Sequence, residues 1–376
     1  MWIHERATWP RFIWDANAIG PVLADVCHRQ GLLLGRMGAL GFDLRQEAGL
    51  ETLTQDVVRS AAIEGEQFAP EDVRSSIARR LGLDVGGTEP ASRDVEGMVE
   101  VLLDATGNVA APLTAERLFS WHAALFPTGR SGMQRIAVGA WRAGPMDVVS
   151  GPLGREAVHF TAPEPERLGA EMAMFLEGLA KGEQNPVLKA AIAHVWFVTI
   201  HPFDDGNGRI ARAIVDMALA RGDGAAQRFY SLSAQIEAER KAYYTELERA
   251  QRGDMDITSW VSWFLGCLGR AIAGSEDRLD KVLTKARFWE RANAAGVNDR
   301  QRLILNRLLD DFRGHMRSSK YATLAKCSPD TALRDIQDLV SKGLLTQNPG
   351  GGRSTSYGLG DEAAPYLRQG QTHKDA

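Results

Sequence analysis

Cysteine, long apolar runs and excess charge are all scarce in this sequence. Its three cysteines, Cys27, Cys267 and Cys327, lie far apart and form no Cys-x-x-Cys pair. This spacing argues against a zinc site and predicts reduced thiols. No run of about 18 apolar residues is present, and the N-terminus lacks the apolar core of a signal peptide. The sequence therefore predicts a cytoplasmic protein with no membrane contact.

The charge balance excludes a strong general attraction to polyanions. The net charge is −4 over 376 residues, which gives no overall pull toward nucleic acid or a membrane surface. The hydrophobic content of 44% is that of an ordinary globular protein. The length suits a chain of two or three domains.

The densest cluster of reactive residue types lies at residues 201–212, which read HPFDDGNGRIAR. Residues 187–200 before it are apolar almost all round, which predicts a buried helix. Pro202 disfavours helical geometry in the residue before it, so the helix is expected to end at about Ile200. His201 then lies on a loop, where an imidazole can act as a general base near neutral pH.

A glycine-containing turn, Gly206-Asn207-Gly208, follows the histidine and precedes a second helix with apolar periodicity. Backbone amides in such a turn at a helix N-terminus can bind an anion. Arg209 and Arg212 are three residues apart on that helix, so both guanidinium groups can reach one polyphosphate. Asp205 is an oxygen ligand suited to Mg²⁺ that is shared with substrate phosphates. These groups together predict a displacement at phosphorus.

The segment resembles the core motif of the Fic family, H-x-F-x-[D/E]-G-N-G-R-x-x-R, at every fixed position. The resemblance implies transfer of AMP from ATP to a Ser, Thr or Tyr hydroxyl of a target protein, with pyrophosphate release and His201 as the base. Asp205 would hold the metal, and Phe203 would pack inward to anchor the loop. The phosphate-binding positions would be Gly206, Asn207, Gly208, Arg209 and Arg212. Each residue alone has an ordinary structural explanation, but all of them in this order favour the enzyme.

Upstream, residues 60–65 read SAAIEG and resemble the family's inhibitory helix signature, [S/T]-x-x-x-E-[G/N]. Ser60 and Glu64 are one turn apart and share a helix face, and Gly65 suits a helix stop. The resemblance implies that Glu64 pairs with Arg212 and displaces the γ-phosphate of ATP, which leaves the enzyme mostly inactive. The alternative is an ordinary amphipathic helix that ends in Glu-Gly.

Residues 147–160 contain two β-prone runs around a Gly-Pro-Leu-Gly turn, which predicts a hairpin. The segment resembles the family's flap, whose exposed strand edge holds the target segment by main-chain pairing. The residues expected to carry this docking are Val148, Val149 and Val158. A surface hairpin without a special role is the alternative.

Three other residues near the motif are assigned from their context. Tyr244 lies in a stretch that resembles the part of the family where aromatic residues border the nucleotide base, although a core position is the alternative. His194, seven residues before His201 on the apolar helix, is expected to be buried and hydrogen-bonded. Asp204 occupies a variable position of the motif and is given a structural role.

The expected fold class is all-α, a mainly helical Fic fold with a small β-hairpin, in three folded parts. Residues 1–95 form an N-terminal helical domain that carries the inhibitory helix and resembles a domain of uncharacterised function found on many bacterial Fic proteins. Residues 96–285 form the catalytic domain, and residues 86–90 read as a linker or loop. Docking and core packing are both open for three N-terminal tryptophans, Trp2, Trp9 and Trp14.

Residues 290–365 read as a winged helix-turn-helix domain that is followed by a disordered tail over residues 366–376. Ser328 and Pro329 suit the N-cap and first position of its third helix. The other expected elements are helices over residues 300–310 and 321–326 and a hairpin with its tip at residues 350–353.

The nucleic-acid signal of this domain is modest. Between Arg313 and Arg353 there are seven Lys or Arg against three Asp. Asp335 and Asp338 lie on the third helix, where they are expected to face phosphates or partners. DNA binding and a role in protein docking or dimerisation are therefore both open.

Two functions other than AMP transfer also stay open. Some Fic relatives use the inhibitory glutamate to position water and remove AMP from a modified target, and Glu64 could do so here. A DNA-binding regulator with the Fic core as a nucleotide sensor is the other. A few family members move UMP, phosphate or phosphocholine, but Arg212 and the phosphate-binding turn favour ATP. The target protein, modification of the chain itself and a homodimer are left open by the sequence.

Overall fold

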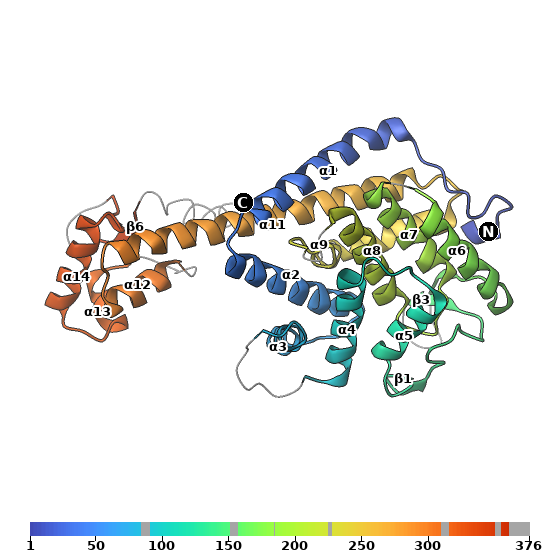
Figure 1. Ribbon diagram of the computed structural model, residues 1–376, viewed down its shortest axis with the longest axis horizontal. Helices are drawn as coiled ribbons and strands as arrows, with labels where there is room; N and C mark the ends of the chain where they lie inside the picture. The colour runs from blue at the N-terminus through green and yellow to red at the C-terminus, as the bar shows by residue number, and fades with distance from the viewer. Residues whose placement is uncertain are drawn as a thin grey trace. The chain divides into compact units, whose positions relative to one another are not determined.

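The computed structural model describes residues 1–83, 91–150, 157–183, 185–224, 228–309, 316–349 and 355–360. Four expected segments lie outside these ranges: the linker at 86–90, the hairpin turn at 151–154, the wing tip at 350–353 and the tail at 366–376. The chain divides into two compact units, Met1–Ser275 and Glu276–Ala376, and the boundary falls inside the long helix α11 (Figure 1).

The described chain is mostly helical, as the sequence predicts. The first unit contains two 3₁₀ turns, η1 (Ile3–Glu5) and η2 (Pro165–Arg167). Its helices are α1 (Ala16–Gly38), α2 (Phe42–Ile63), α3 (Pro70–Arg80), α4 (Arg93–Gly107), α5 (Ala115–Leu125), α6 (Leu168–Lys181), α7 (Pro186–Ile200), α8 (Asn207–Asp223), α9 (Leu232–Ala238), α10 (Arg240–Arg252) and the start of α11 (Thr258–Ala294). The second unit contains the end of α11 and the helices α12 (Asp299–Leu309), α13 (Ser318–Leu324) and α14 (Pro329–Ser341).

The strands form small antiparallel pairs. β1 (Arg130–Ser131) pairs with β2 (Gln134–Arg135), and β5 (Leu345–Gln347) pairs with β6 (Tyr357–Leu359). The hairpin expected over residues 147–160 is present as β3 (Asp147–Ser150) and β4 (Ala157–Thr161), with a register shift between Val148 and Val149.

Helices α7 and α8 pack together inside the first unit. The Asn185 side chain caps α7 by accepting hydrogen bonds from the backbone N–H groups of Val187 and Leu188, and Pro186 occupies the first helical position. The apolar run then ends at Ile200, as Pro202 predicts. Every α8 residue from Arg209 to Ala220 is buried. These two helices therefore hold the loop between them, residues 201–206, on a rigid support.

Two of the N-terminal tryptophans pack against the body of the unit. The Trp2 ring meets Phe160 of β4 edge to face, with 5.2 Å between ring centroids. Trp9 Nε1 donates a hydrogen bond of 2.7 Å to Glu171 of α6. Packing therefore accounts for both residues. None of the helices in the described ranges is both long enough and apolar enough to span a bilayer.

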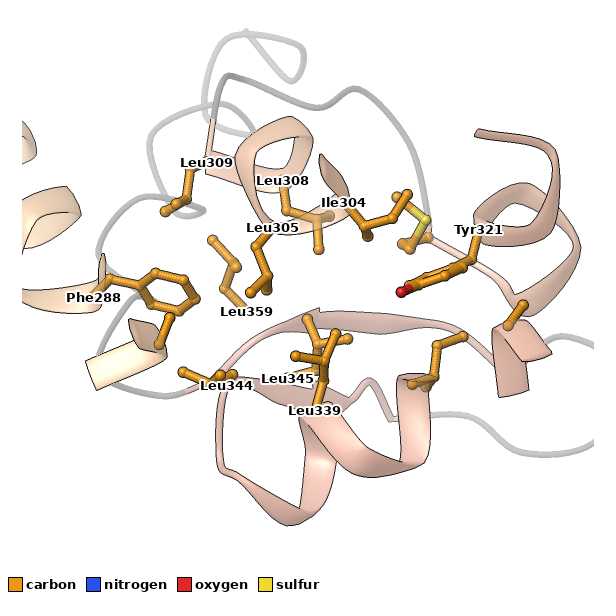
Figure 2. Packing of buried hydrophobic residues seen from close by; sticks show 14 residues of the cluster. Phe288, Ile304, Leu305, Leu308, Leu309, Tyr321, Leu339, Leu344, Leu345 and Leu359 are labelled. Carbon is orange, nitrogen blue, oxygen red and sulfur yellow. The ribbon is translucent and has the colours of Figure 1, made fainter. Parts of the chain in front are cut away.

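The second unit has a core of its own, which Figure 2 shows from close by. Ser328 caps α14 through the backbone N–H of Thr331, and Pro329 is the first helical residue, as the sequence predicts. Leucine and other apolar side chains from all elements of the unit meet in the centre: Phe288, Ile304, Leu305, Leu308, Leu309, Tyr321, Leu339, Leu344, Leu345 and Leu359.

The expectation that Asp335 of α14 faces phosphates or partners is wrong. Asp335 is 7% exposed and accepts hydrogen bonds from Arg300 Nε (2.9 Å) and Tyr321 Oη (3.2 Å). Asp338 pairs with Lys342 one turn later at 2.6 Å and accepts a hydrogen bond from Gln301. Both carboxylates have partners within the unit, because α12 and α13 bring guanidinium, amide and hydroxyl donors to α14.

Candidate active site

His201 terminates α7 in a left-handed backbone conformation, with φ 50° and ψ 58°. Its backbone N–H still bonds to Phe197 O at 2.9 Å, so the residue is fixed to the last turn of the helix. A non-glycine residue rarely adopts positive φ, and such positions cluster at functional sites. The imidazole therefore occupies a defined place where the buried helix meets the loop.

The hydrogen bonds of the His201 ring determine which nitrogen can act as a base. Nδ1 lies 3.2 Å from Val198 O, and a carbonyl can only accept, so Nδ1 carries the proton. Nε2 then keeps its lone pair. Burial is the largest influence on the pKa of His201 and lowers it below its usual value, although the bond to Val198 opposes this shift. The ring is therefore neutral at neutral pH and able to take a proton through Nε2.

Hydrogen bonds made by the Asn207 side chain fix the conformation of the loop after His201. Asn207 Oδ1 accepts from Phe203 N at 3.0 Å, and Asn207 Nδ2 donates to Phe203 O at 2.8 Å. Both polar atoms of this side chain thus shape the loop, and the Asn207 backbone N–H at the start of α8 is available for a phosphate. The Phe203 ring is fully buried, as expected for an anchor.

Both glycines of the turn are closely packed, and Gly206 also has a positive φ that favours glycine. Gly206 has φ 81°, and a Cβ there would lie 2.8 Å from the Phe126 ring. A Cβ at Gly208 would lie 2.2 Å from Glu64 Oε1 and 3.1 Å from Arg212 Nη1. These glycines allow the first turn of α8, with its unpaired backbone N–H groups, to approach a ligand closely.

Asp205 is the expected metal ligand. Its carboxylate is 42% exposed, accepts hydrogen bonds from Ser131 Oγ and Gly206 N, and lies 3.6 Å from Arg209. In the described part of the chain, no three His, Cys, Asp or Glu side chains gather into a metal-binding group. A single carboxylate fits Mg²⁺, which keeps several waters and binds substrate phosphates, better than it fits zinc. The donor set is thus compatible with Mg²⁺ that arrives with a nucleotide.

Arg212 is paired with the end of α2, a contact that the resemblance to the family implies. Glu64 caps that helix, and its Oε1 lies 2.8 Å from Arg212 Nη2. Ser60 accepts twice from the same guanidinium, through Oγ at 2.8 Å and the backbone O at 3.0 Å. The Arg212 side chain is only 3% exposed. Ser60 and Glu64 therefore act together on one buried cation, and Gly65, with φ 87°, ends the helix after them.

Arg209 has a partner that the sequence reasoning missed. Glu66 Oε1 accepts a hydrogen bond from Arg209 Nη1 at 2.8 Å. The guanidinium also lies over the Phe126 ring, 4.9 Å from its centroid. In the sequence, Glu66 is recognisable only as an acidic residue close to the inhibitory signature. That position does not identify Arg209 as its partner.

Three further residues support the site from outside the motif. Arg142 is buried and donates from Nε to His201 O at 2.8 Å, and its backbone N–H bonds to Pro202 O at 2.9 Å. His122 stacks on Phe203. Ser131 in β1 bonds to Asp205. No motif marks these residues, since each reaches the loop from a distant part of the sequence.

The remaining predicted site residues lie on α10 and on the β3–β4 hairpin. Tyr244 of α10 is 42% exposed, and its hydroxyl lies 3.4 Å from Ile63 O at the end of α2, while its neighbour Tyr243 is buried. Val149 and Val158 are register partners in the hairpin, and both are about half exposed. Val148 is partly buried. The structure therefore provides a hairpin with two half-exposed valine side chains.

The two residues given structural roles have them. His194 is buried, and its Nε2 lies 2.9 Å from Tyr243 Oη. Asp204 accepts a hydrogen bond from Ala137 N at 2.8 Å.

Behind the site, a buried ionic cluster joins α2 to α8. Asp216 pairs closely with Arg228, and Asp56 lies 3.7 Å from the same guanidinium and accepts from Ser231 Oγ at 2.5 Å. All four are buried. Burial, with the Asp216 charge next in size, raises the pKa of Asp56 to about 7. This cluster fixes the middle of α2 against the helix that carries both motif arginines.

Two segments of the chain match known families. Residues 112–219 match the Fic/DOC family, and residues 2–83 match a domain of unknown function (DUF4172). The chain thus contains a Fic/DOC domain preceded by a DUF4172 domain. A crystal structure of a Fic family protein from Desulfovibrio desulfuricans G20 has a similar fold, with a TM-score of 0.52 and 20% identity over 91% of this chain and 96% of that one.

The similarity to two curated relatives covers less than a third of the chain. The Uridine 5'-monophosphate transferase of Xanthomonas campestris pv. campestris (strain 8004) is 34% identical over 119 residues, 30% of this chain and 22% of the relative. The Protein adenylyltransferase Fic of Culex quinquefasciatus is 35% identical over 114 residues, 29% of this chain and 21% of the relative. The chain therefore spans about a fifth of the length of these relatives.

Proposed function

We propose that this protein is an adenylyltransferase that moves AMP from ATP to a Ser, Thr or Tyr hydroxyl of a target protein. The observation that carries the proposal is His201, held neutral with its Nε2 lone pair available, beside a turn of backbone amides, one acidic residue and two buried arginines. The Fic/DOC match and the similarity to relatives named adenylyltransferases support the same activity.

The chemistry follows from these groups. His201 Nε2 takes the proton of the target hydroxyl, and the hydroxyl oxygen forms a bond to the α-phosphorus of ATP. The bond between that phosphorus and the oxygen bridging to the β-phosphate breaks, and pyrophosphate leaves with the bond electrons. The first N–H groups of α8, with Arg209 and Arg212, stabilise the charge on the phosphates. Asp205 would hold Mg²⁺, which when bound neutralises phosphate charge.

The target segment would lie along the β3–β4 hairpin. Its exposed Val149 and Val158 suit a protein chain that adds to the strand edge, with Val148 supporting the strand from the partly buried side. Tyr244 would border the base of the nucleotide. The partner is therefore a protein with an accessible hydroxyl, and the chain itself is one candidate.

Regulation is part of the proposal. Glu64 occupies Arg212 at 2.8 Å, so ATP phosphates must displace a carboxylate from a guanidinium that is almost fully buried. The resting enzyme would be mostly inactive, and Glu64→Gly would remove this inhibition.

The test is labelled ATP incubated with the full chain and a cell lysate. Glu64→Gly should raise incorporation of label from α-labelled ATP by about a hundredfold or more, and His201→Ala in the same background should abolish it. Label from γ-labelled ATP should not be incorporated, because the γ-phosphate leaves with pyrophosphate. Equal incorporation by wild type and Glu64→Gly would refute the inhibitory assignment, and incorporation that survives His201→Ala would refute the mechanism.

Transfer of UMP is a second candidate, favoured by the similarity to a uridine 5'-monophosphate transferase. Parallel assays with labelled UTP decide between them. The same variant also tests removal of AMP: an enzyme that uses Glu64 to position water would gain transfer but lose removal in Glu64→Gly.

For the C-terminal unit we infer a winged helix-turn-helix, supported by the order α12, α13, α14 and the β5–β6 pair. We likewise infer that the catalytic domain spans residues 96–285, between the N-terminal helical domain (1–95) and the winged helix (290–365). Salt-dependent retention of the full chain on duplex DNA would support a DNA-binding role for the unit, whereas its absence would favour docking to a protein or a second copy.

A further inference from the structure

The segment that leaves α2 carries a second acidic residue, Glu66, opposite Arg209, the first of the two motif arginines on α8. Its carboxylate oxygen Oε1 lies 2.8 Å from Arg209 Nη1, while Glu64 lies 2.8 Å from Arg212. Glu64 and Glu66 thus each form an ion pair with a different motif arginine. The inhibitory signature ends at Gly65, so it does not include this contact.

Arg209 is enclosed as tightly as Arg212. Its side chain is 5% exposed, with the Phe126 ring on one face, Glu66 at 2.8 Å and Asp205 at 3.6 Å. Arg209 Nε is buried without a hydrogen-bond partner among the described residues, and so is Glu66 Oε2. The pair therefore leaves one buried donor and one buried acceptor unsatisfied, a costly arrangement that a phosphate oxygen bonded to Arg209 Nε would improve.

The backbone fixes Glu66 independently of Glu64. Gly65 turns the chain with φ 87°, and the Glu66 N–H then bonds back to Ala61 O at 3.0 Å, which closes the end of α2. This geometry directs residue 64 and residue 66 at arginines that are three positions apart on α8. Neither the Gly65 turn nor the bond to Ala61 involves the Glu64 side chain, so we expect Glu66 to keep its position when that side chain is removed.

We propose that Glu66 is a second inhibitory residue, which occupies Arg209 and excludes nucleotide phosphates from it while Glu64 excludes them from Arg212. This inference rests on the proposed function of the site. Phosphates must displace two carboxylates to bind both arginines, and a Glu64→Gly variant is only half relieved. Loss of the Glu66 charge alone frees Arg209 but leaves Arg212 blocked.

The experiment measures the affinity of the full chain for Mg²⁺-ATP by calorimetry, which requires no transfer to occur. Four variants are compared: Glu64→Gly, Glu66→Gln, Glu64→Gly/Glu66→Gln and Glu64→Gly/Glu71→Gln. Glu71 is an exposed acid in the first turn of α3, so its change removes the same charge without touching Arg209. Thermal unfolding of each variant confirms that it is folded.

The double variant with Glu66→Gln should bind Mg²⁺-ATP about tenfold more tightly than Glu64→Gly, as expected when a charge pair with a buried arginine no longer competes. The Glu71 control should match Glu64→Gly. Equal affinity of the two double variants would overturn the role of Glu66, as would a gain in the Glu71 control of the same size. Binding without incorporation of label would instead refute the proposed transfer and leave the Glu66 comparison valid.

Discussion

His122 lies flat against Phe203, with ring centroids 4.2 Å apart and 11° between the ring planes. Gly139 N lies 3.3 Å from His122 Nδ1 and so donates to it, which leaves Nε2 to donate to Asp205 O at 3.2 Å. Burial lowers the pKa of His122 to about 4, so the ring is neutral and keeps both hydrogen bonds at neutral pH. A residue from α5 thus holds the loop that presents the proposed base and metal ligand.

Replacing His122 with alanine should weaken both stability and transfer. The change removes a buried ring and two hydrogen bonds, and we expect a loss of roughly 2–4 kcal/mol in the free energy of unfolding. Incorporation of AMP in the Glu64→Gly background should fall more than tenfold, because Asp205 and Phe203 lose their support. Denaturant unfolding and labelled-ATP assays measure the two effects.

The matched variant is His122→Phe, which retains a flat ring against Phe203 but loses both hydrogen bonds. It should lie between wild type and His122→Ala in stability. A His122→Phe protein as active and as stable as the parent would show that the hydrogen bonds to Gly139 and Asp205 are unimportant.

The elements of the site that were predictable from sequence are those set by local signals. Pro202 ends α7 where expected, and the Gly-Asn-Gly turn begins α8, since both depend on backbone preferences of neighbouring residues. The Glu64 contact with Arg212 was predictable only through the family resemblance. Glu66 was missed because its partner is 143 residues away, and nothing in its neighbourhood indicates Arg209.

The C-terminal unit shows the same limit. Ser328 and Pro329 marked the start of α14 correctly. Asp335 was misplaced because the polar face of a helix does not reveal which polar groups other helices bring to it. Arg300 and Tyr321 bind Asp335 from two different helices, and no local pattern contains that information.

Ser60 should contribute to inhibition through its hydroxyl. Ser60→Ala removes the acceptor for Arg212 Nε but leaves the backbone carbonyl and Glu64 in place. Basal incorporation of AMP should therefore rise about three- to tenfold, less than in Glu64→Gly, as expected for one hydrogen bond to a charged group.

The control for this prediction is Ser76→Ala. Ser76 is fully buried on α3, and its hydroxyl has no hydrogen-bond partner among the described residues. Its removal should leave incorporation unchanged. If Ser60→Ala behaves like Ser76→Ala, the hydroxyl plays no part in holding Arg212.

Arg228 should be essential for the stability of the first unit. Its guanidinium forms ion pairs with Asp56 and Asp216, and all three side chains are buried. Arg228→Met leaves the two acids without compensation and should cost about 3–5 kcal/mol of unfolding free energy, measured by chemical denaturation. Adding Asp56→Asn and Asp216→Asn should recover part of that loss, because no buried charge then remains. A triple variant no more stable than Arg228→Met would show that packing, not charge, determines the cost.

His194 should make the first unit less stable in mild acid. Burial lowers the pKa of His194 from 6.5 to about 3. Below pH 6.5 this histidine is therefore protonated in the unfolded chain but stays neutral in the folded protein. The contribution of the neutral His194 ring to the free energy of unfolding is fully present above pH 6.5 and is lost as the pH falls toward 3. Between pH 7 and pH 5 this linkage amounts to about 2 kcal/mol.

A comparison of variants isolates that effect from other titrating groups, such as Asp56, whose raised pKa acts in the opposite direction. His194→Gln should be less stable than wild type at pH 7, and the difference should shrink by about 2 kcal/mol at pH 5, because only wild type carries the histidine penalty. His28→Gln, at an exposed position of α1, should follow wild type at both values. A constant gap between His194→Gln and wild type would contradict the assignment.

Asp335 should control the stability of the C-terminal unit without affecting the first. Asp335→Ala leaves Tyr321 Oη without its buried acceptor and Arg300 without its carboxylate, and we expect a loss of about 2–4 kcal/mol in that unit. Hydrogen exchange should accelerate in α13 and α14, while α7 and α8 stay protected. Asp338→Ala removes a half-exposed carboxylate that pairs with Lys342 one turn later, so it should cost about 1 kcal/mol or less. Faster exchange in α8 of the Asp335 variant would mean that the two units unfold together.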